Sequence, residues 1–321
     1  LSVLMHHSIA TPVLASNYYL RISSKSTTAA DFITNAKKAG LDTTSINIYM
    51  RHLRAIFNNC LKHQWNISNP FNTEKPLRDD DKRYAYLTKE EVTKILKEAA
   101  KISQDILLVF ALGIFAGLRL REILAARWEW ITFHSHLFKN GVMTVESESG
   151  DSDNAFKTKS RKMRSIPLEK TLTNILANVI MCKALKEMDD GSGYINLLDD
   201  EKKMEYLETV KEKMAGYIVN PENKTQSARG LRWDFRKTFN RVLKNAGCET
   251  VNRFGTDETV TCHTLRHTYA SLFAQQGLSA AKIQEYAGHY DPKVTKRYMH
   301  LAPGDENLDL GISIDFSNHD S

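Results

Sequence analysis

The longest apolar stretch of the chain runs from Ile106 to Leu118 and contains no charged or hydrogen-bonding side chain. A membrane-spanning helix needs about 20 apolar residues, so this stretch is too short to cross a bilayer. It indicates instead a helix buried inside a protein core. With 321 residues, 42% of them hydrophobic, the chain can build one large domain or two ordinary ones around such cores.

Charge is unevenly distributed along the chain. Residues 1–86 carry 11 basic and 6 acidic side chains, which gives +5, whereas residues 301–321 carry five acidic and no basic ones, which gives −5. The net charge of +6 therefore leaves +6 for the middle. Two basic blocks are compatible with a nucleic acid, because lysine and arginine release counterions from its phosphates. Many soluble proteins have a similar excess, so charge alone predicts no partner.

The four cysteines, Cys60, Cys182, Cys248 and Cys262, are far apart and form no CxxC pair. This spacing argues against a disulfide framework or a cysteine-bound zinc ion, and it favours a reducing, intracellular environment. The first residue is Leu1 and no secretory signal is recognisable, so the chain can be part of a longer protein.

Two helices are predicted near the start of the chain. The first spans residues 27–40, and the second runs from Thr43 to Leu61 with its apolar side chains on one face. The opposite face carries a polar and basic stripe, formed by Asn47, Arg51, Arg54, Asn58 and Lys62. Such a stripe is usually a solvated surface. The alternative is that its three basic residues contact DNA phosphates.

Residues 66–86 contain two prolines and a charged run without apolar periodicity, so they are predicted to be a linker. A capping box at Thr88 and Glu91 then starts a helical region that extends to about Ala126. Short strands follow, and Ala155–Lys159 is predicted to pair with Arg164–Leu168 in a hairpin.

Helical periodicity returns after residue 169. One late helix is expected to carry four apolar side chains on one face, namely Leu231, Phe235, Phe239 and Val242. Later helices are expected to end at Gly277 and Gly288, and Asp291 caps one more that extends toward Tyr298. The chain is therefore predicted to be mainly α-helical with a small antiparallel β-sheet.

Four polar clusters stand out, and each has an ordinary structural interpretation. The first follows the apolar stretch, as surface charges do at a helix end, and the second is a basic run at residues 157–164 of a kind that is usually solvated. In the third, His263, Arg266 and His267 share one helix face. A zinc site there is disfavoured, because Thr264 stands where a metalloprotease helix has its glutamate. The fourth is a Gly-His pair nine residues before Tyr298.

In their order along the chain, these clusters resemble the tyrosine recombinases of the phage integrase type, over essentially the whole length. The matching positions are Arg119 and Glu122 in Gly-Leu-Arg-Leu-Arg-Glu-Ile-Leu, Lys159 eight residues before Pro167, His263 and Arg266 in His-Thr-Leu-Arg-His, His289 in Ala-Gly-His, and Tyr298 in Lys-Arg-Tyr-Met-His. The resemblance implies a site-specific DNA recombinase or integrase of a mobile element. Such an enzyme cleaves and rejoins strands through a covalent 3′-phosphotyrosine intermediate, without metal, ATP or another cofactor.

The resemblance also assigns roles to these residues. Tyr298 is the nucleophile, Arg119 and Arg266 hold the scissile phosphate, Lys159 protonates the leaving oxygen, His263 and His289 assist, and Glu122 supports them. Simple chemistry agrees with these roles. A phenol has a pKa of about 10, so forming the phenolate at pH 7 costs about 4 kcal/mol, and a base must take the proton during attack. His263 is the natural candidate for this base. Two guanidinium groups can hold both non-bridging oxygens without a metal.

The implied architecture is a two-domain clamp. Residues 1–65 would be a helical core-type DNA-binding domain, 66–86 the linker, 87–303 the catalytic domain and 304–321 a tail. Lys157 and Arg161 would contact DNA beside Lys159. The tail is expected to dock on a neighbouring protomer of a DNA-bound tetramer, although a solvated tail is equally compatible with its sequence. The implied partners are a double-stranded recombination site, further copies of the chain, a host DNA-bending protein and a directionality factor, in the nucleoid of a prokaryotic cytoplasm.

Two other functions fit parts of the pattern. A type IB topoisomerase uses similar chemistry to relax supercoils, but the separate helical domain and short linker favour a recombinase. A DNA-binding regulator of the same fold would not cleave, and it is disfavoured because Arg119, Arg266 and Tyr298 are all present.

Overall fold

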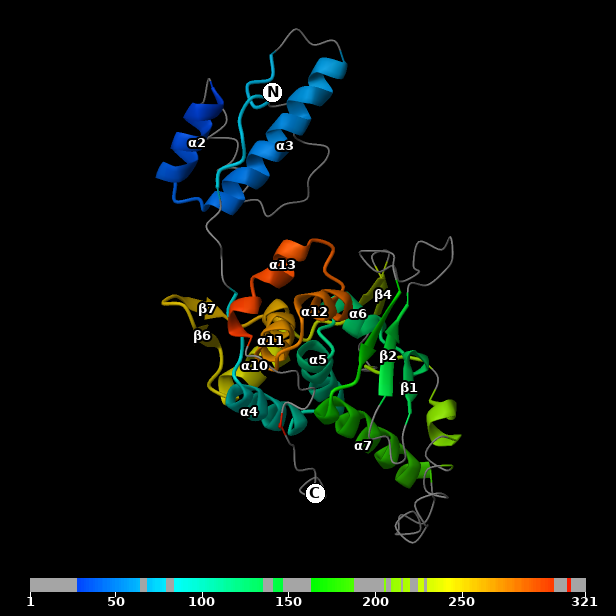
Figure 1. The fold of residues 1–321 in the computed structure, drawn as a ribbon. Helices are drawn as coiled ribbons and strands as arrows, with labels where there is room; N and C mark the ends of the chain where they lie inside the picture. Colours follow the sequence, from blue (N-terminus) through cyan, green and yellow to red (C-terminus); the bar gives the residue numbers. More distant parts are fainter. Residues whose placement is uncertain are drawn as a thin grey trace. The chain divides into compact units, whose positions relative to one another are not determined.

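The computed structural model describes residues 28–63, 68–78, 84–134, 141–146, 163–187, 205, 209–214, 216–219, 225–227, 230–302 and 311–312. The chain divides into two compact units, Leu1–Lys82 and Arg83–Ser321. Within the described residues the chain is mainly helical with small antiparallel sheets, as predicted (Figure 1). No helix among these residues is long and apolar enough to span a membrane.

The first unit is built on two helices, α2 (Ala29–Lys38) and α3 (Thr43–Lys62). Local signals fix where they begin: Thr28 and Asp31 form a capping box on α2, and the Asp42 carboxylate accepts a hydrogen bond from the Ser45 amide at the start of α3. The apolar faces form one small core, whose buried members are Ala29, Phe32, Ala36, Ile46, Met50, Leu53 and Phe71.

Phe71 lies in the segment that the sequence predicts as linker, and the structure corrects that prediction. Its ring is 5% exposed and packs edge-on against Phe32 with ring centroids 5.8 Å apart. The Asn47 amide group makes two hydrogen bonds with the backbone of Leu77, of 2.9 and 2.8 Å. Residues 69–77 therefore pack on α3. Hydrogen bonds and the side chains of Phe71 and Leu77 hold this segment, although its sequence shows no apolar periodicity.

The second unit contains the remaining elements. In chain order they are α4 (Lys89–Ala100), α5 (Gln104–Phe115), α6 (Leu120–Ala125), η2 (Trp128–Trp130), β1 (Ile131–Phe133), β2 (Gly141–Val145), β3 (Arg164–Pro167), α7 (Lys170–Glu187), β4 (Thr225–Ser227), β5 (Gly230–Arg232), α10 (Arg236–Asn245), β6 (Thr250–Asn252), β7 (Asp257–Thr259), α11 (Cys262–Gln275), α12 (Ala280–Ala287), α13 (Pro292–Lys296) and η4 (Met299–Leu301). The predicted capping box at Thr88 and Glu91 is confirmed.

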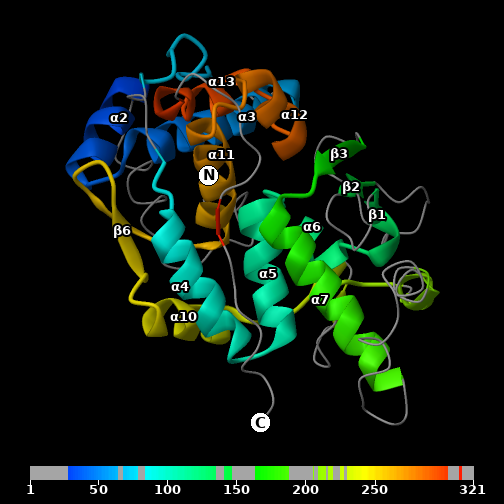
Figure 2. The same cartoon turned by 60° about the horizontal axis from the view of Figure 1, so that its bottom comes forward.

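Helix α5 is the centre of this unit, as its composition predicts. Every residue from Ile106 to Phe115 is buried, and α4, α7 and α11 pack around it, with α4 and α7 on either side in Figure 2. The crossing of α5 with α11 is close, because a β-carbon on Gly113 would lie 2.9 Å from Cδ1 of Leu265. Burying a helix on all sides leaves no polar face, which explains the uninterrupted apolar run.

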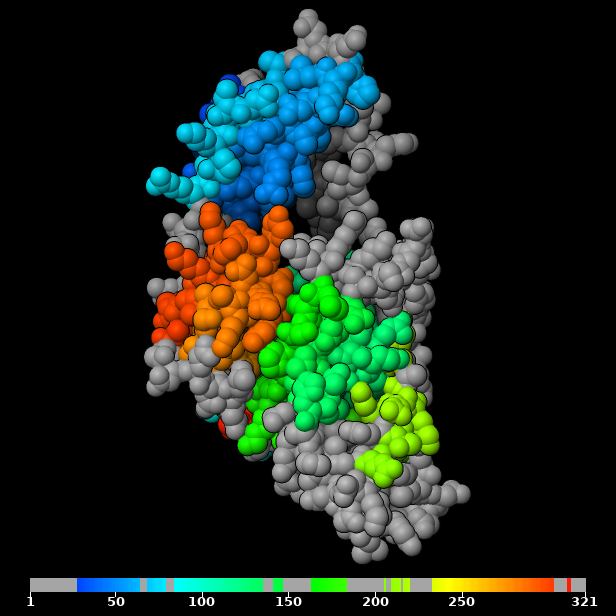
Figure 3. Space-filling view, turned by 45° about the vertical axis from the view of Figure 1, so that its right-hand side comes forward, coloured from blue at the N-terminus to red at the C-terminus, as the bar shows by residue number. Residues whose placement is uncertain are grey.

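Strands β1, β2 and β3 form an antiparallel sheet in that order. Met143 is paired with Ile131 on one side and Ile166 on the other, and all three side chains are buried. The hairpin expected for Ala155–Lys159 lies outside the described residues, and the observed partner of β3 is β2. On the surface, β3 adjoins α12, where the green and orange areas of Figure 3 meet.

One predicted helix face is corrected by the structure. Leu231 lies in strand β5, and α10 begins only after Phe235. Phe239 and Val242 are buried on α10 as predicted, and Phe239 stacks on Phe110 of α5 with centroids 4.7 Å apart. Leu231 has helical spacing to Phe235, but three residues without regular structure separate the strand from the helix.

Candidate active site

Arg119 is placed by the sharp turn that follows α5. Gly117 has φ +60°, and a β-carbon there would meet the Tyr269 ring at 2.6 Å, so only glycine fits this turn. Arg119 then caps α6, and its backbone amide donates to the Glu122 carboxylate (2.9 Å). Its guanidinium donates to the same carboxylate (3.0 Å) and to the Gly288 carbonyl (2.9 Å). Arg121 is exposed on α6, so Arg119 is the arginine of this motif that enters the site.

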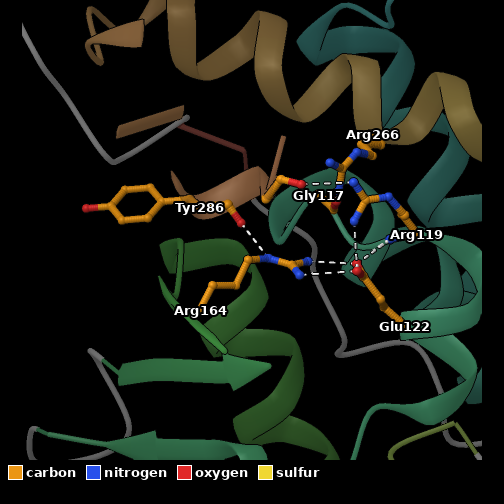
Figure 4. A network of polar contacts seen from close by, with 7 residues as sticks. Gly117, Arg119, Glu122, Arg164, Arg266 and Tyr286 are labelled. Carbon is orange, nitrogen blue, oxygen red and sulfur yellow. Dashed lines mark hydrogen bonds and ion pairs between the residues drawn. The ribbon is translucent and has the colours of Figure 1, made fainter. Parts of the chain in front are cut away.

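Glu122 is the hub of a buried ion-pair network (Figure 4). Arg164, at the start of β3, donates to both of its carboxylate oxygens at 3.1 and 2.7 Å, and the two side chains are only 3% and 6% exposed. The Arg164 Nε also donates to the Tyr286 carbonyl (2.9 Å). Burial alone would raise the pKa of Glu122, but the hydrogen bonds and charges of Arg164 and Arg119 outweigh it and hold the pKa below its usual value.

Arg266 enters the site from α11 and is 5% exposed. Its Nη1 donates to the Gly117 carbonyl at 2.6 Å, whereas its Nη2 is buried without a hydrogen-bond partner among the described residues. Burial, with the charge of Arg119 as the next cause, lowers the pKa of Arg266 to about 9. A buried guanidinium nitrogen without a partner is costly, so this position is suited to an anion.

Tyr298 follows α13 and is 2% exposed. Its hydroxyl forms a 2.6 Å hydrogen bond with Nδ1 of His267. The Tyr84 ring stacks on His267, with centroids 4.2 Å apart and planes 5° apart, and the Tyr84 hydroxyl accepts a hydrogen bond from Arg297. Burial raises the pKa of Tyr298.

His267 and His289 lie next to Tyr298, and His263 lies next to His267. The His289 ring lies nearly parallel to the Tyr298 ring, with centroids 6.4 Å apart, and its Nδ1 forms a 2.8 Å hydrogen bond with the Thr295 hydroxyl. Burial and the nearby arginines, led by Arg266, lower the pKa of His289 to about 3. His263 is exposed in the first turn of α11, with its ring 6.3 Å from that of His267. Burial, then His263 and Arg266, lower the pKa of His267 to about 4.

The second unit thus gathers several of the residues singled out in the sequence. Arg119, Glu122, Arg266, His289 and Tyr298 are linked by hydrogen bonds, ring contacts or mutual electrostatic effects, and His263 lies one ring further out. Among the described residues, no group of three or more histidine, cysteine, aspartate or glutamate side chains could hold a metal ion.

The residues that the sequence predicts to contact DNA differ in how far the structure describes and exposes them. Lys157, Lys159 and Arg161 lie outside the described residues. Arg51 and Lys62 are exposed on α3. Arg54 is partly buried, and its guanidinium donates to the carbonyls of Phe71 (2.9 Å) and Glu74 (2.6 Å). Arg54 is therefore less suited to contact DNA than the two exposed residues, because its Nε and Nη2 bind the backbone of the same unit.

Sequence reasoning did not assign roles to three residues of the site. Arg164 belongs to the basic run at residues 157–164, and no motif in the sequence distinguishes it from the other basic residues. The sequence suggests for His267 only a zinc-ligand role, which is disfavoured, but its spacing of four residues from His263 places both histidines on one helix face. Tyr84 carries no motif that marks it.

The model of the Phage integrase family matches residues 85–304. The integrase of Escherichia phage 186 is 23% identical over 261 residues, which are 81% of this chain and 57% of the phage protein. The XerC-like tyrosine recombinase of Caldanaerobacter subterraneus is 25% identical over 281 residues, which are 82% of this chain and 64% of that protein. The chain thus spans less than two thirds of either relative's length.

Two solved structures share the fold. The Tn1549 transposon integrase in complex with transposon right end DNA has a TM-score of 0.57 at 19% identity, with 91% of this chain and 90% of that chain covered. The XerH site-specific recombinase bound to its difH substrate has a TM-score of 0.50 at 18% identity, with 84% and 65% covered. Because the family model matches more than half of its residues, the chain belongs to the phage integrase family.

Proposed function

We propose that the chain is a site-specific DNA recombinase that cleaves and rejoins strands through a 3′-phosphotyrosine intermediate. The observation that carries this proposal is the buried Arg266 guanidinium, whose Nη2 has no hydrogen-bond partner among the described residues. A phosphodiester would supply the anion that this guanidinium lacks. The phage and transposon integrases among its relatives support a role in integrating or excising a mobile element.

The proposed reaction is a transesterification. The Tyr298 oxygen forms a bond to phosphorus while the bond from phosphorus to the 5′ oxygen breaks, and that oxygen takes a proton from Lys159. Arg119 and Arg266 neutralise the charge on the two non-bridging oxygens, His263 and His289 assist, and Glu122 orients Arg119. The phosphotyrosine ester keeps the energy of the broken bond, so rejoining by the reverse reaction needs no ATP.

The proposed substrate is double-stranded DNA, held between the two units as in a clamp. Arg51 and Lys62 are the residues of α3 that remain available for its phosphates, and Lys157 and Arg161 are proposed contacts beside Lys159. A host DNA-bending protein and a directionality factor are proposed accessory partners. Action on chromosomal or phage DNA would place the protein in the nucleoid of a prokaryotic cytoplasm.

The proposal includes a tetramer assembled on DNA. Ile312 in the tail is 7% exposed, and its carbonyl accepts a 2.7 Å hydrogen bond from the Thr171 hydroxyl at the start of α7. The contact that Ile312 makes within its own unit could be made with a neighbouring protomer instead, as in domain swapping. Deleting residues 304–321 is therefore expected to weaken tetramer assembly on DNA in sedimentation experiments. Unchanged assembly would count against this role of the tail.

The decisive experiment uses a nicked suicide duplex, in which a small fragment leaves after cleavage and rejoining is prevented. The wild-type chain is expected to form a covalent protein–DNA band, and Tyr298→Phe is expected to form none while it binds DNA equally well. A supercoiled plasmid that carries two recombination sites then distinguishes a recombinase from a topoisomerase. Recombinant products are expected, whereas relaxation without recombinants would indicate a topoisomerase. DNA binding without a covalent band would indicate a regulator.

A further inference from the structure

The Tyr298 hydroxyl has a different partner from the one that the sequence suggests. Its 2.6 Å hydrogen bond goes to Nδ1 of His267, whereas His263 is exposed and one ring further away. No other hydrogen-bond partner of this hydroxyl is found among the described residues. The direction of this hydrogen bond is set by the tautomer of His267: with the ring proton on Nε2, Nδ1 accepts the proton of the Tyr298 hydroxyl.

Neighbouring side chains fix the orientation of the His267 ring. Tyr84 covers one of its faces in a nearly parallel stack, and the Tyr84 hydroxyl is held in turn by Arg297, the residue immediately before Tyr298. The four residues form a closed loop of contacts that keeps Nδ1 directed at the hydroxyl. His267 itself is rigidly mounted, because it lies in α11 next to the buried Arg266.

The charges around His267 match the role of a proton acceptor. The titratable and charged groups near it are Tyr84, Tyr298, His263, His289 and Arg266. Burial, followed by His263 and Arg266, lowers the pKa of His267 to about 4. The imidazole is therefore neutral at pH 7, with a lone pair available. An entering phosphate would pair with the cation of Arg266, and this removes part of what disfavours a protonated His267.

The pKa values also define when the proton moves. Burial raises the pKa of Tyr298, so a free phenolate does not form in the empty site. As the oxygen bonds to phosphorus it becomes far more acidic, and transfer to His267 becomes favourable only at that stage. The nucleophile thus stays neutral until a phosphate is in place.

We propose that His267 is a further catalytic residue, which accepts the Tyr298 proton at Nδ1 as the oxygen–phosphorus bond forms and returns it during rejoining. This inference rests on the function proposed above. The balance is complete: the tyrosine proton moves to His267, the leaving 5′ oxygen gains its proton from Lys159, and rejoining reverses both transfers.

The test measures single-turnover cleavage of the nicked suicide duplex by the full chain, at saturating DNA, from pH 7 to pH 9. His267→Asn keeps an acceptor near Nδ1 but cannot take a proton, so its cleavage rate is expected to fall by about 10²-fold or more at pH 7. Its deficit relative to wild type should shrink about tenfold per pH unit, because the phenolate then forms by direct ionisation. His263→Asn is measured beside it, and His300→Asn, an exposed imidazole two residues after Tyr298, is the matched control.

Three results would overturn the inference. The first is a cleavage rate of His267→Asn within threefold of the wild-type rate at pH 7. The second is a rate deficit of His267→Asn that stays the same from pH 7 to pH 9. The third is a rate deficit that shrinks with rising pH in His263→Asn and not in His267→Asn. DNA affinity and thermal midpoint, measured for each variant, identify a loss that comes from misfolding, and His267→Gln then repeats the test. Failure of the proposed function looks different, because the wild-type chain itself would give no covalent band.

Discussion

Replacing Arg164 tests whether the buried ion pair with Glu122 stabilises the candidate site. Arg164→Met keeps most of the side-chain volume but leaves the Glu122 carboxylate, 3% exposed, without its bidentate partner. Removing one partner of a buried pair typically costs about 3–5 kcal/mol, and the lost hydrogen bond to the Tyr286 carbonyl adds about 1 kcal/mol. Because Arg119 still donates to Glu122, we expect the lower end of this sum, a fall of about 4 kcal/mol in the free energy of unfolding of the second unit.

Urea titration followed by tryptophan fluorescence measures this change, because three of the four tryptophans lie in the second unit. Arg121→Met, at an exposed position of α6 next to Glu122, is the control and should change the stability by less than about 0.5 kcal/mol. In the double variant Arg164→Met, Glu122→Gln, the loss should be smaller than the sum of the single losses by about 2 kcal/mol or more. Additive losses, or a single loss below about 1 kcal/mol, would refute the reasoning.

Three further predictions concern other parts of the chain. Burial keeps His267 and His289 neutral in the folded state, so the unfolded state binds more protons below pH 6.5. The free energy of unfolding should therefore fall by about 2 kcal/mol per imidazole between pH 6.5 and pH 5. Urea titrations that show no fall would contradict this prediction. Gly288→Ala should cost about 1–3 kcal/mol in the same assay, because φ is +68° and the new methyl group would lie 3.1 Å from Arg164; an unchanged midpoint would show that the loop adapts. Arg54→Met should lower the thermal midpoint of the first unit without changing the salt dependence of DNA binding, and a shallower salt dependence would restore Arg54 as a phosphate contact.

Those parts of the fold that depend on local signals were predictable from the sequence. The apolar run gave the buried helix α5, and Thr88 with Glu91 gave the start of α4. The attachment of residues 69–77 to α3 was not predictable, because it depends on hydrogen bonds such as that from Arg54 to Phe71, which leave no periodic pattern. Local propensity carries little information about contacts between distant segments.

The candidate site shows the same division. The order of the motifs identified Arg119, Arg266 and Tyr298 as one set, and the structure brings them into one region of the second unit. The order of the motifs did not identify Arg164. Arg164 matters because it forms an ion pair with Glu122, which is 42 residues away in sequence. Likewise, the spacing of the two histidines in α11 placed both on one face. The structure shows that the Tyr298 hydroxyl contacts His267 of these two histidines.

The contact between Gly113 and Leu265 has a consequence for how the site can vary. Leu265 adjoins Arg266, and the helix that contains Gly113 ends just before Arg119, so this uncharged crossing sets the spacing of the two guanidinium groups. A methyl group at position 113 would push these two helices apart and change the distance between Arg119 and Arg266. A glycine that carries no functional group thus contributes to the geometry of the candidate site through packing alone.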